Sequence, residues 1–539
     1  MATLRRLWAA DDPELDQVQR PRDDLVREQP TGPGRFEQAH GPFTRYERRL
    51  DPDPSGGVLE TVSYRVRVPW FGWLFLPLVR LTERRRNPGV APGHQPWWAP
   101  RDRLDERQVA VLGLMAAASL VAAFVNTLFT QTVNFAADEF GVGNGAQGIA
   151  GTVVRFGILA VAPLAFVADR LGRRTVIVGC ALAAPLLASV GAIAPSFVTL
   201  TATQTVARPI GLVLELLIGV VVAEEMPRNS RAYAVSLTAL AGGLGSGLCV
   251  MALTLADLGP TAWRLVYVLS LVWVVVAWDL WRRLPETHRF EAHRSHGPDA
   301  AQTSAELEAE ATAAAELRRQ HLRRLALLAT VAFVGNLFVA PASFFQNRYL
   351  DDVRGYSAGG ISLFTLVTTT PVGIGVLVGG RLADKTGRRV LGATTLVVGT
   401  TAFVISFGTA GAAMWLSAVT GSIVLGATVP ALGVYRTELF ATGSRSMSSY
   451  LITTSALVGG SIGLLWTGHA LDGGRTHFSV LGLLALGQVA VAVIVLTRFP
   501  ETAHKELEEL NPQDAVDYVA PPAEGEDDPG IRPDPPATP

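Results

Sequence analysis

Apolar stretches long enough to cross a bilayer recur along most of the chain, and a short polar loop follows each one. A helix needs about 20 apolar residues for such a crossing, because each residue adds about 1.5 Å. Only helices are expected, because every backbone N–H and C=O group in lipid must find a partner within its own segment. We therefore predict twelve spans, near residues 109–131, 148–168, 175–194, 198–222, 232–255, 264–283, 325–346, 359–380, 390–409, 412–434, 447–469 and 477–498.

The polar regions divide these spans into two groups of six. The predicted fold class is therefore an all-α membrane protein with two pseudo-symmetric six-helix bundles, at residues 108–284 and 325–499. A charged cytoplasmic linker, 285–324, separates the bundles. Residues 1–107 are predicted to be cytoplasmic and partly disordered, and the Pro- and acid-rich residues 500–539 to form a disordered cytoplasmic tail.

One segment of the N-terminal region, residues 68–81, is apolar but too short to span a bilayer. It contains Trp70 and Trp73, and arginines flank it on both sides. This pattern is typical of a segment that lies in the plane of an anionic leaflet. A short element that packs on the cytoplasmic face of the bundle is the alternative.

Basic residues gather in the loops on one side of the predicted bundle. By the positive-inside rule this side is cytoplasmic, so both termini are expected in the cytoplasm and the protein in the plasma membrane. No charged segment followed by an apolar one opens the chain, and we expect no cleavable signal peptide. The cytoplasmic loops carry Arg170, Arg173, Arg174, Arg228, Arg231, Arg282, Arg283, Arg381, Lys385, Arg388, Arg389, Arg436 and Arg445, and the opposite loops only Arg264, Arg348, Arg354 and Arg475.

Composition excludes several classes of protein. Apolar residues make up 49% of the chain and charged residues 17%, whereas a soluble domain carries about 25% charged residues. The net charge of −1 argues against a nucleic-acid partner. Cys180 and Cys249 both lie in apolar runs, so neither a disulfide framework nor a thiolate metal site is expected. Neither a H-E-x-x-H motif nor a phosphate-binding P-loop is present, and we predict no enzymatic activity, metal or cofactor.

The two halves of the chain repeat one another. Three motifs recur in the same order at an offset of 214 or 215 residues, which indicates duplication of a six-helix unit. The pairs are Asp169–Arg174 with Asp384–Arg389, Glu224–Arg231 with Glu438–Arg445, and Pro285–Thr287 with Pro500–Thr502.

These motifs resemble those of the major facilitator superfamily. The paired D-R/K-x-G-R-R loops, the E-x-x-P-x-x-x-R motif after the fourth span and the two Pro-Glu-Thr sequences are similar to its sugar and metabolite porter branch. Trp263 and Arg264 at the start of the sixth span also fit that branch. The resemblance covers roughly residues 108–510, and it departs from the usual pattern at Ala165 and Ala441. It implies secondary transport by alternating access.

The arginine-rich loops are candidates for a cytoplasmic gate. Arg173 and Arg174 are placed to form ion pairs with Glu224 or Glu225, and such pairs would bias the equilibrium between open and closed states. Loop charge that only sets topology is the alternative. The predicted gate residues are Asp169, Gly172, Arg173, Arg174, Glu224, Arg231, Asp384, Gly387, Arg388, Arg389, Glu438 and Arg445.

The fourth span carries the clearest candidates for cargo binding. Gln204, Arg208 and Glu215 recur at helical spacing and share one face. Charge within a span marks a functional site by default. Arg208 is a candidate for holding an anionic or polar cargo, and Glu215 for carrying a coupling proton. A structural ion pair between helices is the alternative.

Further polar residues lie in spans that line the cavity in the resembled family. Asn126 and Gln131 of the first span and Asn336 of the seventh are candidates for hydrogen bonding to cargo, with interhelical bonding as the alternative. Arg155 of the second span is a third charged candidate, and snorkelling toward the interface is its alternative.

We therefore predict a monomeric, proton-coupled secondary transporter, a symporter, for a small polar or anionic metabolite, with the lipid bilayer as its surroundings. Drug efflux is one alternative, although the glycine-rich fifth span lacks the closing Gly-Pro typical of efflux relatives, since the next proline is Pro260. A membrane sensor built on the same scaffold is another.

Overall fold

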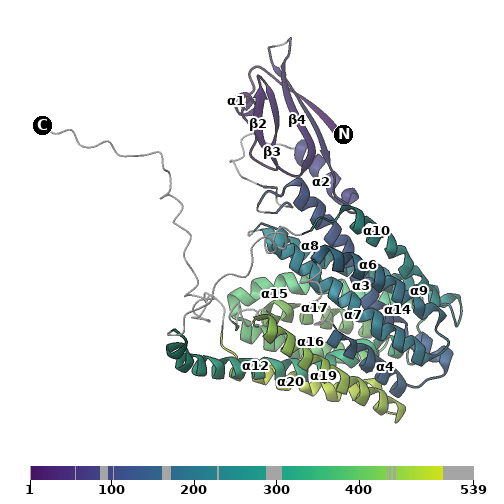
Figure 1. Ribbon diagram of the computed structural model, residues 1–539. Helices are drawn as coiled ribbons and strands as arrows, with labels where there is room; N and C mark the ends of the chain where they lie inside the picture. The colour runs from purple at the N-terminus through teal and green to yellow at the C-terminus, as the bar shows by residue number, and fades with distance from the viewer. Residues whose placement is uncertain are drawn as a thin grey trace. The chain divides into compact units, whose positions relative to one another are not determined.

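The computed structural model describes residues 2–54, 56–84, 95–96, 98–100, 102–160, 172–227, 230–286, 306–433, 435, 439–440 and 445–501 (Figure 1). The chain divides into two compact units. The first contains Met1–Ala301 with Gln346–Leu366, and the second Gln302–Phe345 with Val367–Pro539.

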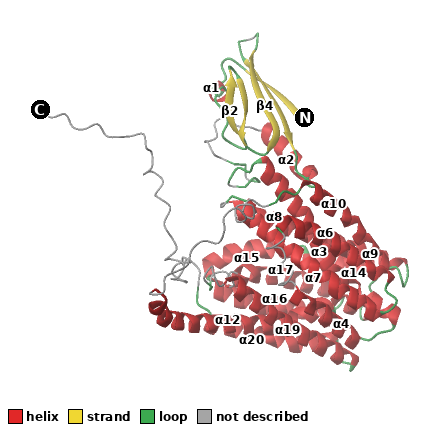
Figure 2. Cartoon of the chain, in the orientation of Figure 1, coloured by secondary structure: helices red, strands yellow, loops and turns green. Residues whose placement is uncertain are grey.

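The first unit begins with a five-stranded antiparallel sheet, which the hydrophobic pattern did not predict (Figure 2). Its strands lie in the order β1-β5-β4-β3-β2, so the first strand pairs with the last. The strands are β1 (Ala2–Trp8), β2 (Arg27–Gly32), β3 (Arg35–His40), β4 (Phe43–Pro52) and β5 (Val58–Val66), and the short helix α1 (Leu15–Val18) lies between β1 and β2. The expectation of a partly disordered N-terminal region is wrong for these residues.

A buried charge network explains why the sheet escaped prediction. Arg48 of β4 is fully buried, and its Nη2 pairs with Glu28 Oε2 at 2.6 Å. Its Nη1 lies 3.5 Å from Glu60 Oε1. Burial raises the pKa of the Tyr46 hydroxyl, which therefore stays protonated and donates to Glu28 Oε1 at 2.6 Å. Charged residues thus occupy inward positions, where a sequence pattern expects apolar ones.

The helix α2 (Gly72–Arg84) connects the sheet to the membrane helices. Glu83 near its C-terminus accepts a hydrogen bond from buried Arg22 at 2.8 Å. Val79 belongs to the apolar core of the sheet, whereas Phe71, just before the helix, belongs to the core of the first helical bundle. The two cores therefore meet along one face of α2.

Helices, several of them short, make up most of the remaining described residues of both units. In the first unit these are α3 (Glu106–Phe140), α4 (Asn144–Phe156), η1 (Gly157–Ala160), α6 (Arg173–Ser189), η2 (Val190–Ile193), α7 (Phe197–Glu225), α8 (Arg231–Ala252), η4 (Leu253–Leu258), α9 (Arg264–Leu269), η5 (Ser270–Trp273), α10 (Val274–Arg283), α13 (Gln346–Asp352) and α14 (Ala358–Thr369), whose last three residues belong to the second unit. The second unit contains α12 (Glu306–Phe344), α15 (Val372–Thr386), α16 (Arg388–Gly408), α17 (Gly411–Gly433), α19 (Arg445–Asp472) and α20 (His477–Arg498).

Eleven helical segments among the described residues are long and apolar enough to cross a membrane. They coincide with eleven of the twelve predicted spans. The remaining predicted span, 148–168, begins as α4 and η1, and its residues 161–168 lie outside the described part.

The predicted boundaries need one correction. The charged linker was expected over residues 285–324, but α12 begins at Glu306, so its last part is helical and continuous with the seventh span. Alanine and glutamate, which dominate this stretch, favour helix strongly. Residues 502–539 of the predicted tail lie outside the described part.

Both halves use the same glycine packing. A Cβ added to Gly245 of α8 would lie 2.3 Å from Leu120 O of α3, and one on Gly459 of α19 would lie 2.1 Å from Phe333 O of α12. Only glycine allows the backbones to approach so closely. The corresponding residues lie 214 and 213 positions apart, close to the offset of the repeated motifs, so the duplication extends to the packing of the helices.

We predict that Arg48→Met destabilises the sheet by about 3–5 kcal/mol, because the substitution leaves buried carboxylates without their cation. Hydrogen exchange of β4 and β5 in the purified full chain would measure the loss. Arg49→Gln is the matched control, since Arg49 lies next in the same strand but its side chain is half exposed. Equal exchange in both variants would show that the network contributes little.

Candidate functional site

The two arginine-rich loops of the repeat have the same backbone geometry. Gly172 and Gly387 adopt φ angles of 94° and 90°, in a region that favours glycine. Each glycine directly precedes a helix, α6 or α16, and the following two residues are arginines. The glycines therefore turn the chain so that a new helix starts at the arginine-rich end of the bundle.

The glutamates of the two Pro-Glu-Thr sequences cap these helices. Glu286 Oε1 accepts a hydrogen bond from the backbone N–H of Arg174 at 3.1 Å. Glu501 accepts from the backbone N–H groups of Arg388 and Arg389, at 2.9 and 3.2 Å. A carboxylate is favourable there because helix N-termini carry partial positive charge. Sequence reasoning found the repeat of these glutamates but missed this role.

The second arginine of each loop binds the end of another helix. Arg174 Nη2 donates to the carbonyl oxygen of Trp281 at 2.9 Å, and Arg389 Nη2 donates to that of Leu496 at 2.7 Å. Cations are favourable at helix C-termini. Arg174 therefore contacts a helix end, although the sequence analysis also considered a carboxylate partner for it.

An ion pair joins the loop to the fourth span. Arg173 Nη2 lies 2.8 Å from Glu224 Oε1, and the side chains are only 17% and 11% exposed. Arg231 donates from Nε to the carbonyl oxygen of Met226 at 3.2 Å, which closes the turn after α7. The structure thus contains one of the ion pairs that the sequence analysis considered.

Four of the predicted gate residues cannot be placed in full. Asp169 and Glu438 lie outside the described residues. The backbones of Asp384 and Arg445 belong to α15 and α19, and their side chains lie outside the described part.

Two arginines of the first unit lie in neighbouring helices, away from the loops. Arg155 and Arg208 each lie eleven residues after the start of their helix, α4 or α7, which is about 16 Å along it at about 1.5 Å per residue. Both side chains are partly buried. Snorkelling of Arg155 toward the interface remains the alternative to a role in binding.

Close packing of the two helices brings these arginines together. A Cβ on Gly157, two residues after Arg155, would lie 2.7 Å from Thr205 O. The segments that carry Arg155 and Arg208 are therefore closely packed neighbours. Among the described residues, neither has a carboxylate partner or a hydrogen bond.

Glu215 has a different partner from the one considered in the sequence analysis. Its Oε2 accepts a hydrogen bond from Asn126 Nδ2 of α3 at 3.2 Å, and no ion pair with Arg208 forms in the described structure. Gly211 makes this contact possible, because a Cβ there would lie 2.6 Å from Asn126 Oδ1. The Glu215 side chain is exposed on the surface of the first unit.

The remaining polar candidates bond mainly to backbone. Buried Gln204 donates to Ala188 O of α6 at 3.2 Å, which favours interhelical bonding. Gln131 accepts from Asn347 Nδ2 at its side-chain oxygen, at 2.9 Å. Asn336, in the second unit, donates to Ala332 O of its own helix at 3.2 Å.

Sequence reasoning missed a polar cluster at the opposite end of the first unit. Buried Asn134 of α3 donates to Asp351 Oδ2 of α13 at 3.1 Å. Arg348 of α13 pairs with Asp138 of α3 and, at 2.6 Å, with Asp352. These contacts join α3 to α13. The charged residues of this cluster lie near helix ends, where charge is common, so no sequence signal distinguished them.

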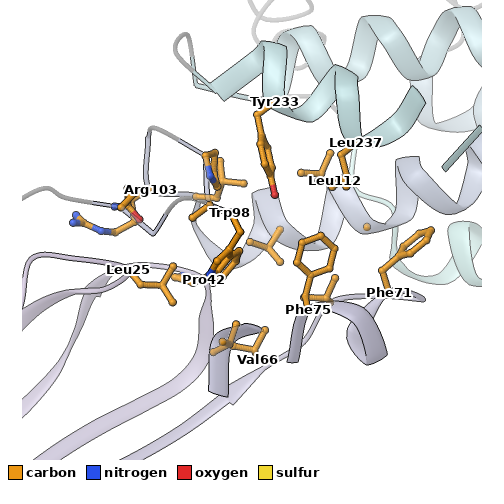
Figure 3. A pocket seen from close by; sticks show the side chains of 18 of the residues that line it. Leu25, Pro42, Val66, Phe71, Phe75, Trp98, Arg103, Leu112, Tyr233 and Leu237 are labelled. Atoms are coloured by element: carbon orange, nitrogen blue, oxygen red, sulfur yellow. The ribbon is translucent and has the colours of Figure 1, made fainter. Parts of the chain in front are cut away.

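Figure 3 shows an apolar cavity between the N-terminal region and the helices of the first unit. Phe71 and Phe75 line it beside Leu112 of α3 and Leu237 of α8, and Trp98 lies opposite. Its lining is mostly apolar and includes neither Arg155 nor Arg208. The cavity marks the junction between the N-terminal region and the bundle.

Comparisons with known proteins support one family. The sequence matches the model of the Major Facilitator Superfamily over residues 115–464. No curated protein sequence matches the chain. The fold is similar to that of several solved structures at low sequence identity, which carries information on the fold alone.

Three of these structures illustrate the likeness. A bacterial homologue of the human lysosomal transporter Spinster, inward-facing and unoccupied, is 19% identical with a TM-score of 0.54, over 72% of this chain and 95% of that chain. The xylose transporter XylE from E. coli, in an inward open conformation, is 15% identical with a TM-score of 0.58, over 76% and 99%. The nucleoside transporter NupG is 11% identical with a TM-score of 0.55, over 72% and 100%.

The resemblance inferred from the loop motifs is thereby confirmed. The matched residues make up more than half of the chain and include both arginine-rich loops. The spans, the duplicated loop geometry and the family match agree, and the chain belongs to the Major Facilitator Superfamily, with its fold of two six-helix bundles.

Proposed function

We propose that this protein is a secondary active transporter that moves a small anionic metabolite by alternating access, coupled to protons. Two arginines of the first bundle, Arg155 of α4 and Arg208 of α7, carry this proposal. The segments that hold them pack closely, since a Cβ on Gly157 would lie 2.7 Å from Thr205 O, and neither arginine has a carboxylate partner among the described residues. Charges within spans commonly mark the path of substrate or ions.

The energetics favour an anion at this site. An arginine at the centre of a span costs about 2.5–3.5 kcal/mol on insertion scales, and repulsion between two neighbouring arginines adds to this cost. A carboxylate or phosphate would offset both terms, because its oxygens match the fork of a guanidinium group. Arg155 and Arg208 are therefore the proposed cargo-binding residues.

The charges of Arg155 and Arg208 also help to distinguish a transporter of anions from the alternative functions. A cationic drug would be repelled by two arginines, which argues against efflux of such compounds. XylE and NupG are named as carriers of xylose and nucleosides, cargoes that need no cationic pair. A sensor on this scaffold would bind an anion without moving it, so flux into proteoliposomes separates a sensor from a transporter.

The arginine-rich end of the helices forms the proposed cytoplasmic gate. We propose that it faces the cytoplasm of a plasma-membrane protein, by the positive-inside rule. The ion pair between Arg173 and Glu224 is a contact that can form in one state of an alternating-access cycle and break in the other. Its role would be to bias that equilibrium, without contact to cargo.

Arg208→Gln is expected to weaken binding of the preferred anion by about 10- to 150-fold, because a hydrogen bond to a charged group contributes about 1.5–3 kcal/mol. A thermal-shift screen of carboxylates, phosphate esters and neutral sugars on the purified protein would identify the anion, and titration would measure the loss. Arg475→Gln, at an exposed loop position, is the control. Unchanged anion affinity, or stabilisation by sugars alone, would contradict the proposal.

Glu215→Gln is expected to abolish proton-driven accumulation but to preserve exchange of cargo down its gradient. The amide oxygen of glutamine can still accept the hydrogen bond from Asn126, so the main change is the loss of a titratable group. Counterflow and pH-jump assays in proteoliposomes distinguish the two activities. A Gln variant that still concentrates cargo would exclude Glu215 as the coupling group.

Glu224→Gln is expected to shift the balance of inward and outward accessibility by about 5- to 30-fold, the effect of about 1–2 kcal/mol, and to lower turnover at unchanged cargo affinity. Exchanging the two residues, in the double variant Arg173→Glu with Glu224→Arg, should restore part of the loss. Cysteine accessibility from each side would report the balance. Loss of cargo affinity in the single variant would indicate direct contact with cargo.

A further inference from the structure

The helix α2 has two different faces. Val79 and Glu83 are buried against the sheet, whereas Trp73, Leu74 and Leu81 are exposed on the other side. Trp73 is the most exposed of the three, at 71%. The exposed residues recur at helical spacing and form one apolar stripe. A stripe of this kind on a helix that adjoins membrane spans indicates contact with lipid.

Tryptophans of a neighbouring span mark the depth of this stripe. Trp278 and Trp281 of α10 are 53% and 54% exposed, and their ring centroids lie 5.2 Å apart. They lie near the end of the membrane span Arg264–Arg283, beside Arg282, whose guanidinium lies over the Trp278 ring. Tryptophan concentrates at the level of the lipid headgroups.

A direct contact holds the start of α2 at this level. Trp70 Nε1 donates to Asp279 Oδ2 of α10 at 3.1 Å. The backbone of Trp70 has a φ of 62°, which is unusual for a residue other than glycine. The surrounding contacts must hold this conformation in place, and it places the tryptophan next to α10. The contact therefore ties the start of α2 to the end of a membrane span, where its tryptophans lie (Figure 1).

The charges near the stripe are positive. Arg80 and Arg84 of α2 and Arg282 and Arg283 of α10 are all exposed. Asp279 is the nearby acidic residue, and it pairs with Arg283 at 2.9 Å. Exposed arginines beside an apolar stripe complement the negative surface of a leaflet that contains anionic phospholipids.

We infer that α2 is an in-plane membrane anchor whose outer face binds the anionic phospholipid surface at the arginine-rich end of the bundle. Its inner face holds Phe71 and Phe75 against α3 and Glu83 against Arg22 of the sheet region. The anchor thus keeps the N-terminal sheet at the membrane surface. This inference is independent of the cargo proposed above.

Lipid quenching of a site-specific probe tests the anchor in the full-length protein. Cys180 and Cys249 are first replaced by alanine, and a fluorophore is attached to a cysteine at Trp73 or at Leu81. Glu37→Cys serves as the control, because Glu37 is exposed on β3 of the same region. We expect spin-labelled lipid to quench the probes on α2 several-fold more than the probe on β3, and aqueous iodide to show the reverse order.

Two outcomes would overturn the anchor. Quenching of the Trp73 and Leu81 probes by iodide and not by lipid would place the stripe in water. Protection from both quenchers that disappears on dilution would instead indicate a second copy of the chain on this face. Unchanged melting of each labelled variant shows that it is folded.

The charge dependence has its own test, in vesicles of phosphatidylcholine with and without phosphatidylglycerol. We expect lipid quenching at Trp73 to increase with phosphatidylglycerol, and the increase to be lost in Arg80→Gln with Arg84→Gln. The control is Arg5→Gln with Arg27→Gln, which removes the same charge from exposed positions of the sheet. Quenching that is independent of phosphatidylglycerol in the unmodified protein, or equal loss in both double variants, would overturn anionic recognition by α2.

Discussion

Hydrocarbon cannot hydrate polar groups, and this constraint determines how the membrane-spanning part of the protein is organised. Backbone groups are paired within helices, and most charged side chains lie at helix ends, where water or a helix terminus satisfies them. Arg155 and Arg208 depart from this rule, since they lie in predicted spans away from the polar loops and lack an acidic partner among the described residues. These two arginines are therefore the strongest candidates for a cargo site.

The same constraint explains the duplicated loops. Where each new helix starts, a glutamate accepts hydrogen bonds from backbone N–H groups that the helix itself cannot satisfy. The glycine before it allows the turn, and the second arginine of the loop bonds the end of another helix. The ion pair between Arg173 and Glu224 lies beside these contacts, and we propose that it forms in one state of the transport cycle and breaks in the other.

In the N-terminal sheet, buried charges are compensated by neighbouring groups of opposite charge. Arg48, Glu28 and Glu60 are removed from water together, so each charge is compensated by its neighbours and by the hydroxyl of Tyr46. In β4 the inward position of Arg48 interrupts the alternation of apolar and polar residues, although Val62, Tyr64 and Val66 of β5 do alternate with polar residues.

The sequence by itself determined the spans, the duplication and the family, because the apolar length of a helix and the spacing of its loop motifs are properties of the linear chain. It also brought Arg208 and Arg155 forward as candidates, because charge in an apolar run is visible without a structure. Only the tertiary structure decided which groups meet. It packed the segments that carry Arg155 and Arg208 against each other, paired Glu215 with Asn126, and placed Glu286 at the start of α6. Such pairings depend on how helices approach one another, and residues such as Gly157 and Gly211 set that approach through packing between segments distant in the chain.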